Sequence, residues 1–481
     1  MRLSALMILL VVISPPAVAE DERVKLVAEP HVFESASGES VEAELGELRV
    51  PENRAAEHTR MITLRFVRFP STAEKPGAPI VYLAGGPGGS GIAAARGSRF
   101  PLFMALRELG DVIAFDQRGT GMSEPDLDCS EQYVLPFDEP ATRYEASKIL
   151  ADAAAECFER LRKDGADLSG YTTVENAADL VDLRRALGAE KLRLIGISYG
   201  SHLALAAMKN HPDGIERVVL AGPEPLHHTL KLPSDQQTLL EEISRLATID
   251  ATTRKQVPDL LGSIEKLLDE LREEPQTVSV TDPRSGATIP VTVGVEDLQG
   301  ILAGMLRGPD SFATMPDLVY RLEQDDWLAL AIMSAGQRFG TLPGAMSLVM
   351  DCASGASAAW LKRIEREAKT TLLGDAINSF MPGICQGLGV PDLGDEFRAP
   401  VESDIPTLVI AGTLDGRTPS SNAAELEKQL GDVKTVVIEG AGHGTPLFMS
   451  SPKIAESIAA FMRGEDVPHE VITLEDPVSF V

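Results

Sequence analysis

Ser198, Asp415 and His443 have the residue types and the chain order that nucleophilic acyl chemistry needs. A serine hydroxyl attacks a carbonyl when a base takes its proton, and the base in turn needs an acid to orient it. Ser198 is the centre of GISYG, residues 196–200, a G-x-S-x-G pattern between an apolar run and an apolar, helix-like stretch. This context favours a tight strand-to-helix turn that lifts the hydroxyl clear of a sheet at a helix N-terminus.

His443 and Asp415 are the base and the acid that we expect to serve this serine. His443 lies in the glycine-rich stretch EGAGHGTP just after an apolar run, where a base can lean over a serine at the top of a sheet. Asp415 also follows an apolar run, in AGTLDGRTP. Glu224, in LAGPEP, is the rival acid, and capping of the turn before Gly416 is the structural alternative for Asp415.

Three further histidines receive other roles. His202 lies four residues after Ser198 on the same predicted helix, so it should point along that helix. We therefore expect His202 to be buried or to lie behind the residues that contact substrate. His227 and His228 come after a predicted strand and could line the pocket.

Six short apolar runs end in loops and alternate with helix-like segments such as VENAADLVDLRRALG; the runs are PIVYLA, DVIAFD, LRLIGI, RVVLAG, PTLVIAG and KTVVIEG. Continuous apolar runs suit strands of a parallel sheet that is covered on both faces. The pattern therefore predicts an α/β, doubly wound sheet. Upstream, AELGELRVPE and MITLRFVRF alternate and predict antiparallel strands at the edge of that sheet.

The helical period dominates between Pro225 and Pro400, as in TLLEEISRLATI and LLGSIEKLLDELREE. One strand pair surrounds a turn in TVSVTDPRSGATIPVTV, and parallel-type strand signals resume only at IPTLVIAG. We therefore expect residues 225–400 to be a mainly helical lid inserted between two strands. Residues 20–224 and 401–481 would then form the catalytic domain.

The first residues have the pattern of a secretion signal. Arg2 supplies the positive charge, residues 3–13 an apolar core, and residues 17–19 the small-residue cleavage pattern. This apolar core is too short to form a transmembrane helix, and we find no later apolar run that is long enough to span a membrane. The sequence predicts a signal peptide over residues 1–19 and a chain exported to the periplasm or the outside without membrane insertion.

The four cysteines are Cys129, Cys157, Cys352 and Cys385, and none belongs to a C-x-x-C pair, which argues against a metal or redox motif. In an oxidising compartment an even number suggests two disulfides. Three pairings are possible, and we expect the sequence neighbours to pair, Cys129 with Cys157 and Cys352 with Cys385. Each bridge would stabilise the fold by about 3–4 kcal/mol through the entropy of the unfolded chain.

The balance of charged residues limits the classes of molecule that the chain could bind. The chain has 72 acidic and 44 basic residues and a net charge of −28. No basic stripe interrupts the acidic residues, which argues against nucleic acid or anionic lipid as a partner. The acidic surface keeps the chain soluble, and it could attract positively charged substrate ends.

The stretch VYLAGGPGGSG, residues 81–91, breaks an apolar run with five glycines. Three of them match G-x-G-x-x-G, and Asp116 lies about 25 residues further on, as a ribose-binding acid would. Against nucleotide binding, Pro87 has no N–H to offer a phosphate, and such cofactors are scarce outside the cell. We interpret the loop as bare backbone beside Ser198.

Five motifs in this order, GGPGGSG, FDQRGTGMSEP, GISYGS, LDGRTP and GAGHG, resemble the proline iminopeptidase and tripeptidyl aminopeptidase branch of the α/β-hydrolases, from Glu44 to Arg463. The order serine, aspartate, histidine is also that of α/β-hydrolases. The resemblance implies that fold, a helical lid, hydrolysis of amides at peptide N-termini and no cofactor. Two departures stand out: iminopeptidases usually begin the glycine loop with His, where Ala84 stands here, and the family's LDG reads LAG at residues 220–222.

By this resemblance the glycine loop supplies half of an oxyanion hole. Gly86 would donate from the loop and Tyr199 from the elbow, both through backbone N–H groups. Asp116 and Arg118, in DQRGTG, would hold the loop by hydrogen bonds rather than touch substrate.

An aminopeptidase also needs carboxylates to bind the ammonium group of its substrate. Glu224 is the first candidate, because it follows a strand end on the side of the active site. Glu241 and Glu242, on the first helix of the predicted lid, are further candidates.

The sequence thus predicts an exported serine exopeptidase that acts on a peptide or a small amide or ester. Ser198 would attack, His443 would move the proton, and Asp415 would orient the imidazole. An esterase that acts on small esters with the same triad is the alternative within the fold. The intact order of the triad argues against a binding module that has kept the fold without the chemistry.

Overall fold

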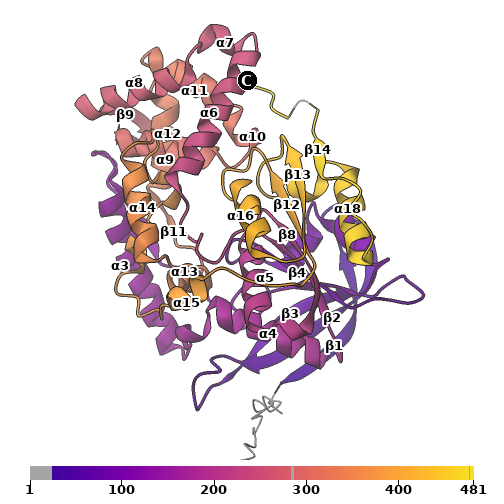
Figure 1. Ribbon diagram of the computed structural model, residues 1–481. Coiled ribbons are helices and arrows are strands. Elements are labelled where there is room, and N and C mark those ends of the chain that lie inside the picture. Colours follow the sequence, from indigo (N-terminus) through magenta and orange to yellow (C-terminus); the bar gives the residue numbers. More distant parts are fainter. Residues whose placement is uncertain (1–23, 283–285, 476, 481) are drawn as a thin grey trace, which may run out of the picture.

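A ten-stranded sheet forms the centre of the molecule, with helices on both of its faces (Figure 1). The computed structural model describes residues 24–282, 286–475 and 477–480, so the predicted signal peptide lies outside the described residues. The strands follow the order β1-β2-β3-β5-β4-β7-β8-β12-β13-β14. Their bounds are β1 (Lys25–Glu34), β2 (Ser40–Pro51), β3 (Met61–Phe69), β4 (Ile80–Leu83), β5 (Val112–Phe115), β7 (Leu192–Ile197), β8 (Ile215–Ala221), β12 (Thr407–Gly412), β13 (Val433–Glu439) and β14 (Val471–Thr473).

The strand assignments from the sequence are confirmed. The six apolar runs become β4, β5, β7, β8, β12 and β13, and all of them pair in parallel. β2 and β3 pair antiparallel next to the edge, as their alternation predicts. The predicted α/β-hydrolase architecture is therefore present, while β1 and β14 extend the sheet beyond what the sequence analysis predicts.

Alternate side chains of the strands face two separate hydrophobic clusters, as Leu194 and Ile195 of β7 illustrate. Helices α3 (Arg143–Lys163), α4 (Thr173–Ala186), α5 (Tyr199–Asn210) and α16 (Ser421–Gln429) cover one face. Helices α1 (Gly91–Arg96), α2 (Phe100–Leu106), α17 (Pro446–Met449) and α18 (Pro452–Arg463) cover the other. Because both faces are covered, the parallel strands consist mostly of apolar residues.

Residues 225–400, which we call the inserted segment, lie between β8 and β12, two strands that are neighbours in the sheet. The segment is mainly helical and has a hydrophobic cluster of its own. In Figure 1 it lies beside and above the sheet, in magenta to orange. Its elements are α6 (Pro233–Ile249), α7 (Thr253–Gln256), α8 (Leu260–Glu273), β9 (Gln276–Thr281), β10 (Thr288–Val293), α9 (Val295–Met305), α10 (Pro309–Phe312), α11 (Met315–Glu323), α12 (Leu328–Gln337), β11 (Phe339–Thr341), α13 (Ala345–Ser354), α14 (Ala358–Ala368) and α15 (Gly394–Arg398).

A second excursion, after β5, packs against the inserted segment, and the sequence analysis does not predict it. Its strand β6 (Gln132–Val134) pairs antiparallel with β11. The buried guanidinium of Arg338 donates hydrogen bonds to the carbonyls of Pro136 and Glu139, at 2.7 and 2.8 Å. The same guanidinium forms a 2.7 Å ion pair with the buried Asp297. Arg338 thereby joins two segments that are far apart in the sequence.

Two disulfides lie in these outer parts of the chain. Cys129 is bonded to Cys157, and Cys352 to Cys385. The first bridge anchors α3 to the segment before β6, and the second anchors α13 to a short turn of helix. Among the described residues, no helix combines the length and the apolar character that crossing a membrane requires.

We expect Arg338→Met to lower the free energy of unfolding by about 3–5 kcal/mol, because it leaves the buried Asp297 carboxylate without its cation. Urea denaturation measures this loss. The exposed pair of Arg321 and Asp326 provides the control, and Arg321→Met should leave the unfolding midpoint close to that of the parent. Equal effects of the two substitutions would contradict the role assigned to Arg338.

Candidate active site

Ser198 stands at a sharp turn between β7 and α5. Its backbone φ of 54° is unusual for a residue with a side chain, and such strain is typical of a nucleophile elbow. Two glycines make the turn sterically feasible. A Cβ atom on Gly200 would lie 2.0 Å from the carbonyl oxygen of Leu83, and one on Gly196 would lie 2.3 Å from the carbonyl oxygen of Gly200. Only glycine fits either position, which explains the G-x-S-x-G pattern.

Asp415 and His443 are in direct contact. Asp415 follows β12 and His443 follows β13, and the carboxyl ends of parallel strands meet at one edge of the sheet. His443 Nδ1 lies 2.8 Å from Asp415 Oδ2. The Asp415 side chain is fully buried, whereas the His443 side chain is 15% exposed. A buried carboxylate in this position holds an imidazole in one tautomer and orientation.

Thr418 is a member of this arrangement that the sequence analysis missed. Its hydroxyl donates a 2.8 Å hydrogen bond to Asp415 Oδ2 and lies 3.1 Å from His443 Nδ1. The backbone N–H groups of Arg417 and Thr418 both donate to Asp415 Oδ1 at 2.8 Å. The carboxylate is thus held by several donors in addition to the imidazole. The residues after Asp415, GRTP, carry no stronger signal than that of a turn.

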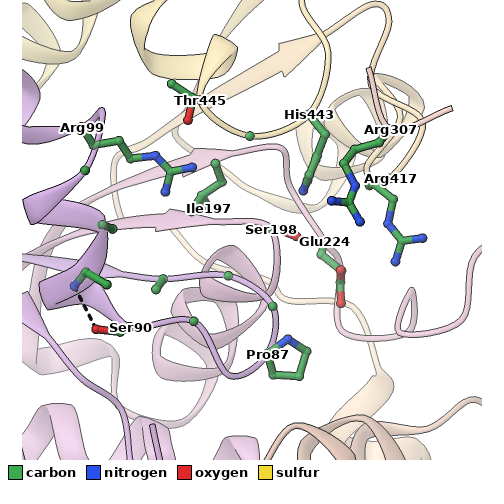
Figure 2. A pocket seen from close by; sticks show the side chains of 18 of the residues that line it. Pro87, Ser90, Arg99, Ile197, Ser198, Glu224, Arg307, Arg417, His443 and Thr445 are labelled. Carbon is green, nitrogen blue, oxygen red and sulfur yellow. Dashed lines mark hydrogen bonds between the residues drawn. The ribbon is translucent and has the colours of Figure 1, made fainter. Parts of the chain in front are cut away.

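A cavity of about 690 Å³ brings Ser198 and His443 together. Both residues line it, along with the glycine loop and residues of the inserted segment (Figure 2). No hydrogen bond joins Ser198 Oγ to His443 Nε2 among the described residues. Catalytic hydrogen bonds are often long in a ligand-free site and tighten when substrate binds. The arrangement offers a nucleophile, a base and an acid at the carboxyl ends of three parallel strands, β7, β13 and β12.

The two predicted oxyanion donors are Gly86, which lines the same cavity as Ser198, and Tyr199, which follows Ser198 in the chain. Gly86 lines the cavity, and among the described residues its N–H has no hydrogen-bond acceptor. Tyr199 is the first residue of α5, so its N–H lacks an acceptor within the helix. The Tyr199 side chain is buried and does not line the cavity, and its hydroxyl lies 3.2 Å from Thr173 Oγ1. A role for either residue would therefore use the backbone alone, and it stays a prediction.

The glycine loop is held by Asp116 and Gln117. Asp116 accepts hydrogen bonds from Ser90 Oγ at 2.6 Å and from the N–H of Ile92 at 3.0 Å, and burial raises the pKa of its carboxyl. The Gln117 amide donates to the carbonyl of Ala84 at 2.9 Å. The sequence analysis assigns this task to Asp116 and Arg118, and for Arg118 the structure differs.

The Arg118 guanidinium is fully buried and points away from the loop. It donates to both carboxylate oxygens of Asp179, at 2.7 and 2.6 Å, and to the carbonyl of Glu52 at 2.6 Å. These contacts connect α4 to the end of β2, so Arg118 braces the core. Its neighbour Gln117 makes the contact to the loop.

Glu224 lines the cavity, yet its charge is already matched. Glu224 Oε2 lies 2.6 Å from Lys231 Nζ. Burial opposes ionisation, but the positive charge of Lys231 keeps the pKa of the Glu224 carboxyl below its ordinary value. His202 Nδ1 lies 3.8 Å from Glu224 Oε1. Burial lowers the pKa of the His202 imidazole to about 4, so the ring is neutral. His202 is buried as its helical position predicts.

Five charged residues of the cavity are not predicted from the sequence: Arg99, Lys231, Arg307, Asp351 and Arg417. Burial, and then the negative charge of Glu224, raise the pKa of the Asp351 carboxyl to about 7. In Figure 2, the guanidinium groups of Arg307 and Arg417 lie side by side next to His443, with Glu224 below them. Arg417 belongs to the motif LDGRTP, but the motif does not indicate where its side chain lies, and only the tertiary fold brings these residues together.

His227 and His228 do not line the cavity, contrary to the sequence-based expectation. Their Nε2 atoms lie 3.3 and 3.0 Å from the carboxylate oxygens of Glu425 on α16. The ligand atoms of these three residues lie within 4.8 Å of one another, so this is a place where the chain could hold a metal ion. Glu241 and Glu242 are also outside the cavity lining, and Glu242 is paired with Arg245.

Comparison with known proteins agrees with the fold. A family model described as the alpha/beta hydrolase fold matches residues 78–448. The chain is 34% identical over 187 residues to a tripeptidyl aminopeptidase of Streptomyces coelicolor, which covers 36% of this chain and 34% of that protein. It is 25% identical over 458 residues to the serine protease Hip1 of Mycobacterium tuberculosis, which covers 88% and 85%. A proline iminopeptidase of Xylella fastidiosa is 30% identical over 146 residues, covering 30% and 32%.

The extent of these matches differs. This chain spans about a third of the length of the tripeptidyl aminopeptidase that it matches, and most of the length of Hip1. Each of the three relatives is named as a protease or a peptidase.

We expect the parent protein to react with a fluorophosphonate probe and Ser198→Ala to lose that labelling, because the alanine has no hydroxyl to phosphonylate. Ser201→Ala is the matched control, since its hydroxyl donates to the Ser198 carbonyl and lies one helical turn away. Gel fluorescence with circular dichroism separates loss of labelling from loss of fold. Labelling of a folded Ser198→Ala protein as strong as that of the parent would show that another residue is the nucleophile.

Proposed function

The chain belongs to the α/β-hydrolase family, and from that premise we propose that it is an exported serine exopeptidase that releases residues or short peptides from peptide N-termini. The observation that carries the proposal is the 2.8 Å contact between His443 and the buried Asp415, at the same cavity as Ser198. A nucleophile, a base and an orienting acid are the groups that acyl transfer requires.

In the proposed mechanism, Ser198 Oγ attacks the carbonyl carbon of the scissile amide. His443 Nε2 accepts the hydroxyl proton while its Nδ1–H donates to Asp415, and Thr418 keeps that carboxylate in place. The protonated imidazole then gives its proton to the leaving amine, and the acyl-enzyme forms. Water attacks the acyl-enzyme with the same imidazole as the base, and the acid product and Ser198 Oγ–H are restored.

The N–H groups of Gly86 and Tyr199 stabilise the oxyanion of each tetrahedral intermediate in this proposal. Their lack of acceptors within the described chain supports the assignment. Loss of one such donor costs about 3–4 kcal/mol of transition-state stabilisation in comparable enzymes. Asp116 and Gln117 hold the loop that carries Gly86, so they act on the reaction through its backbone.

Glu224 and Asp351 bind the ammonium group of the substrate N-terminus in this proposal. The two carboxyls lie close enough for the charge of Glu224 to raise the pKa of Asp351. A substrate ammonium placed beside them relieves that repulsion and favours ionisation of Asp351. Glu224 alone, already paired with Lys231, offers less negative charge than the sequence suggests, so Asp351 supplies the unmatched part.

Export and a lid complete the proposal. The N-terminal sequence and the two disulfides support export to an oxidising compartment.

The inserted segment supplies Arg307 and Asp351 to the cavity, and Ser347 Oγ donates a 2.8 Å hydrogen bond to the carbonyl of Pro87 in the glycine loop. We therefore assign residues 225–400 as a lid that restricts the site to narrow substrates such as peptide ends. The peptidase names of the relatives are in agreement with this.

We expect N-terminal acetylation of a peptide substrate to lower kcat/KM by about 10- to 100-fold, because it removes the charge that the carboxyls bind. Chromatographic assay of matched peptides measures the ratio. An N-methylated peptide, which keeps its positive charge, controls for the added bulk and should be cleaved. Equal cleavage of the acetylated peptide would contradict the exopeptidase assignment, and hydrolysis confined to simple esters would favour the esterase.

A second prediction concerns pH. Since the pKa of Asp351 is about 7, its carboxyl becomes charged as the pH rises through that value, and ammonium binding should strengthen. The ratio of kcat/KM for the parent to that for Asp351→Asn should therefore increase between pH 5.5 and 7.5 with a free-amine peptide. The titration of other groups divides out of this ratio. A ratio that does not change with pH would contradict the role of Asp351.

A further inference from the structure

We propose that Arg307 and Arg417 form a carboxylate-binding subsite of the catalytic cavity, so that the preferred substrates carry a carboxylate close to the scissile bond. This inference rests on the proposed function and names the class of its substrate.

The charge of the cavity is opposite to that of the chain. The whole chain has 72 acidic and 44 basic residues. The cavity is lined by two acidic residues, Glu224 and Asp351, and by four basic ones, Arg99, Lys231, Arg307 and Arg417. A pocket that concentrates positive charge within an acidic protein attracts and holds anionic groups.

Two of the four cations already have partners. Lys231 is paired with Glu224 at 2.6 Å. The Arg99 guanidinium donates to the hydroxyl of Tyr82 and lies 5.5 Å from the ring centre of Phe448. Among the described residues, the guanidinium groups of Arg307 and Arg417 have neither an ion pair nor a hydrogen bond. They are the cations of the cavity that remain available to a ligand.

Backbone contacts fix both arginines next to the catalytic residues. The N–H of Arg417 donates to Asp415 Oδ1 at 2.8 Å, and the carbonyl of Arg307 accepts from the N–H of His443 at 3.1 Å. A Cβ on Gly416 would lie 2.0 Å from the carbonyl oxygen of Leu306. The backbone segments that carry Arg417 and Arg307 are therefore in close contact. The side chains are then free to project into the cavity, where Figure 2 shows them side by side.

This pairing of like charges has an energetic cost that a ligand would remove. Burial lowers the pKa of Arg417 and the charge of Arg307 lowers it further, while the carboxyls of Glu224, Asp415 and Asp351 act in the opposite direction. Two guanidinium groups that share a pocket repel each other until an anion lies between them. The structure thus keeps two cations beside the base, and no described carboxylate forms an ion pair with either guanidinium.

A carboxylate fits this site better than a neutral polar group. The guanidinium fork matches the two oxygens of a carboxylate, and such charged hydrogen bonds are about twice as strong as neutral ones. The carboxylate can belong to an aspartate or glutamate side chain near the cleaved bond, or to the C-terminus of a short peptide. Arg417 also lines a second cavity, of about 440 Å³.

Matched substrates test the inference on the full-length protein. One pair of peptides differs only by aspartate or asparagine next to the scissile bond, and a second pair only by a free or an amidated C-terminus. We expect the parent to favour the carboxylate member of at least one pair by about 10-fold or more in kcat/KM. Arg417→Gln and Arg307→Gln should reduce that preference to about 2-fold, mainly through KM, and should affect the neutral substrates much less. The pair that responds identifies the source of the carboxylate.

Arg245→Gln is the matched control. Arg245 is 58% exposed, lies outside the cavity lining and carries the same charge, so its loss should leave the preference unchanged. Fluorophosphonate labelling of each variant verifies that the site is folded. Absence of any preference in the parent, or a preference that persists when both cavity arginines are replaced, would overturn the subsite.

The outcome is separable from that of the proposed function. The same comparison with p-nitrophenyl esters of a dicarboxylic acid half-amide and half-acid needs no N-terminus and no peptide. A protein that hydrolyses only esters but prefers the half-acid, with loss of this preference in Arg417→Gln, would contradict the exopeptidase assignment and support the subsite. A protein that cleaves free-amine peptides equally well with and without the carboxylate would support the exopeptidase assignment and contradict the subsite.

Discussion

The close packing of α5 against the end of β4 is the constraint on which the site depends. The carbonyl oxygen of Leu83 occupies the space that a Cβ on Gly200 would need. This contact holds the strained backbone of Ser198, and it sets the elbow beside the glycine loop that leaves β4. This backbone contact therefore helps to place the glycine loop beside Ser198. Asp415 and His443 reach the same edge because β12 and β13 are parallel to β7 and β8.

The electrostatics of the cavity differ from those of the surface. A chain with a net charge of −28 encloses a pocket in which basic residues outnumber acidic ones. The carboxyls of Glu224 and Asp351 line this pocket together with the two arginines beside His443. A substrate with an ammonium and a carboxylate near the cleaved bond satisfies both groups. Short or acidic peptides have this pair of charges, which connects the proposed function with the proposed subsite.

The sequence predicts those features that depend on local backbone geometry. The six parallel strands follow from continuous apolar runs, and the elbow follows from glycines two residues on either side of Ser198. Asp415 and His443 were selected because each follows a strand, and the structure brings these two into contact. These signals are strong because strand, turn and helix each restrict the residue types over a short window.

Features that depend on distant parts of the chain leave no such signal. Asp351 and Arg307 come from helical stretches whose period reports only which face is buried. Gln117 and Arg118 are neighbours in one motif, and only the fold decides that Gln117 reaches the loop while Arg118 turns toward Asp179. The pairing of β6 with β11 joins short segments about 200 residues apart, and loop closure over such a distance leaves no local pattern.

The central claim is that Ser198, the glycine loop and His443 act on one carbonyl. A crystal structure of the phosphonylated protein tests it most directly, because the phosphonyl group mimics the tetrahedral intermediate. The account predicts a bond from Ser198 Oγ to phosphorus and a phosphonyl oxygen about 2.7–3.1 Å from the N–H nitrogens of Gly86 and Tyr199. A phosphonyl oxygen that faces away from Gly86, or a phosphonate bound to another residue, would contradict it.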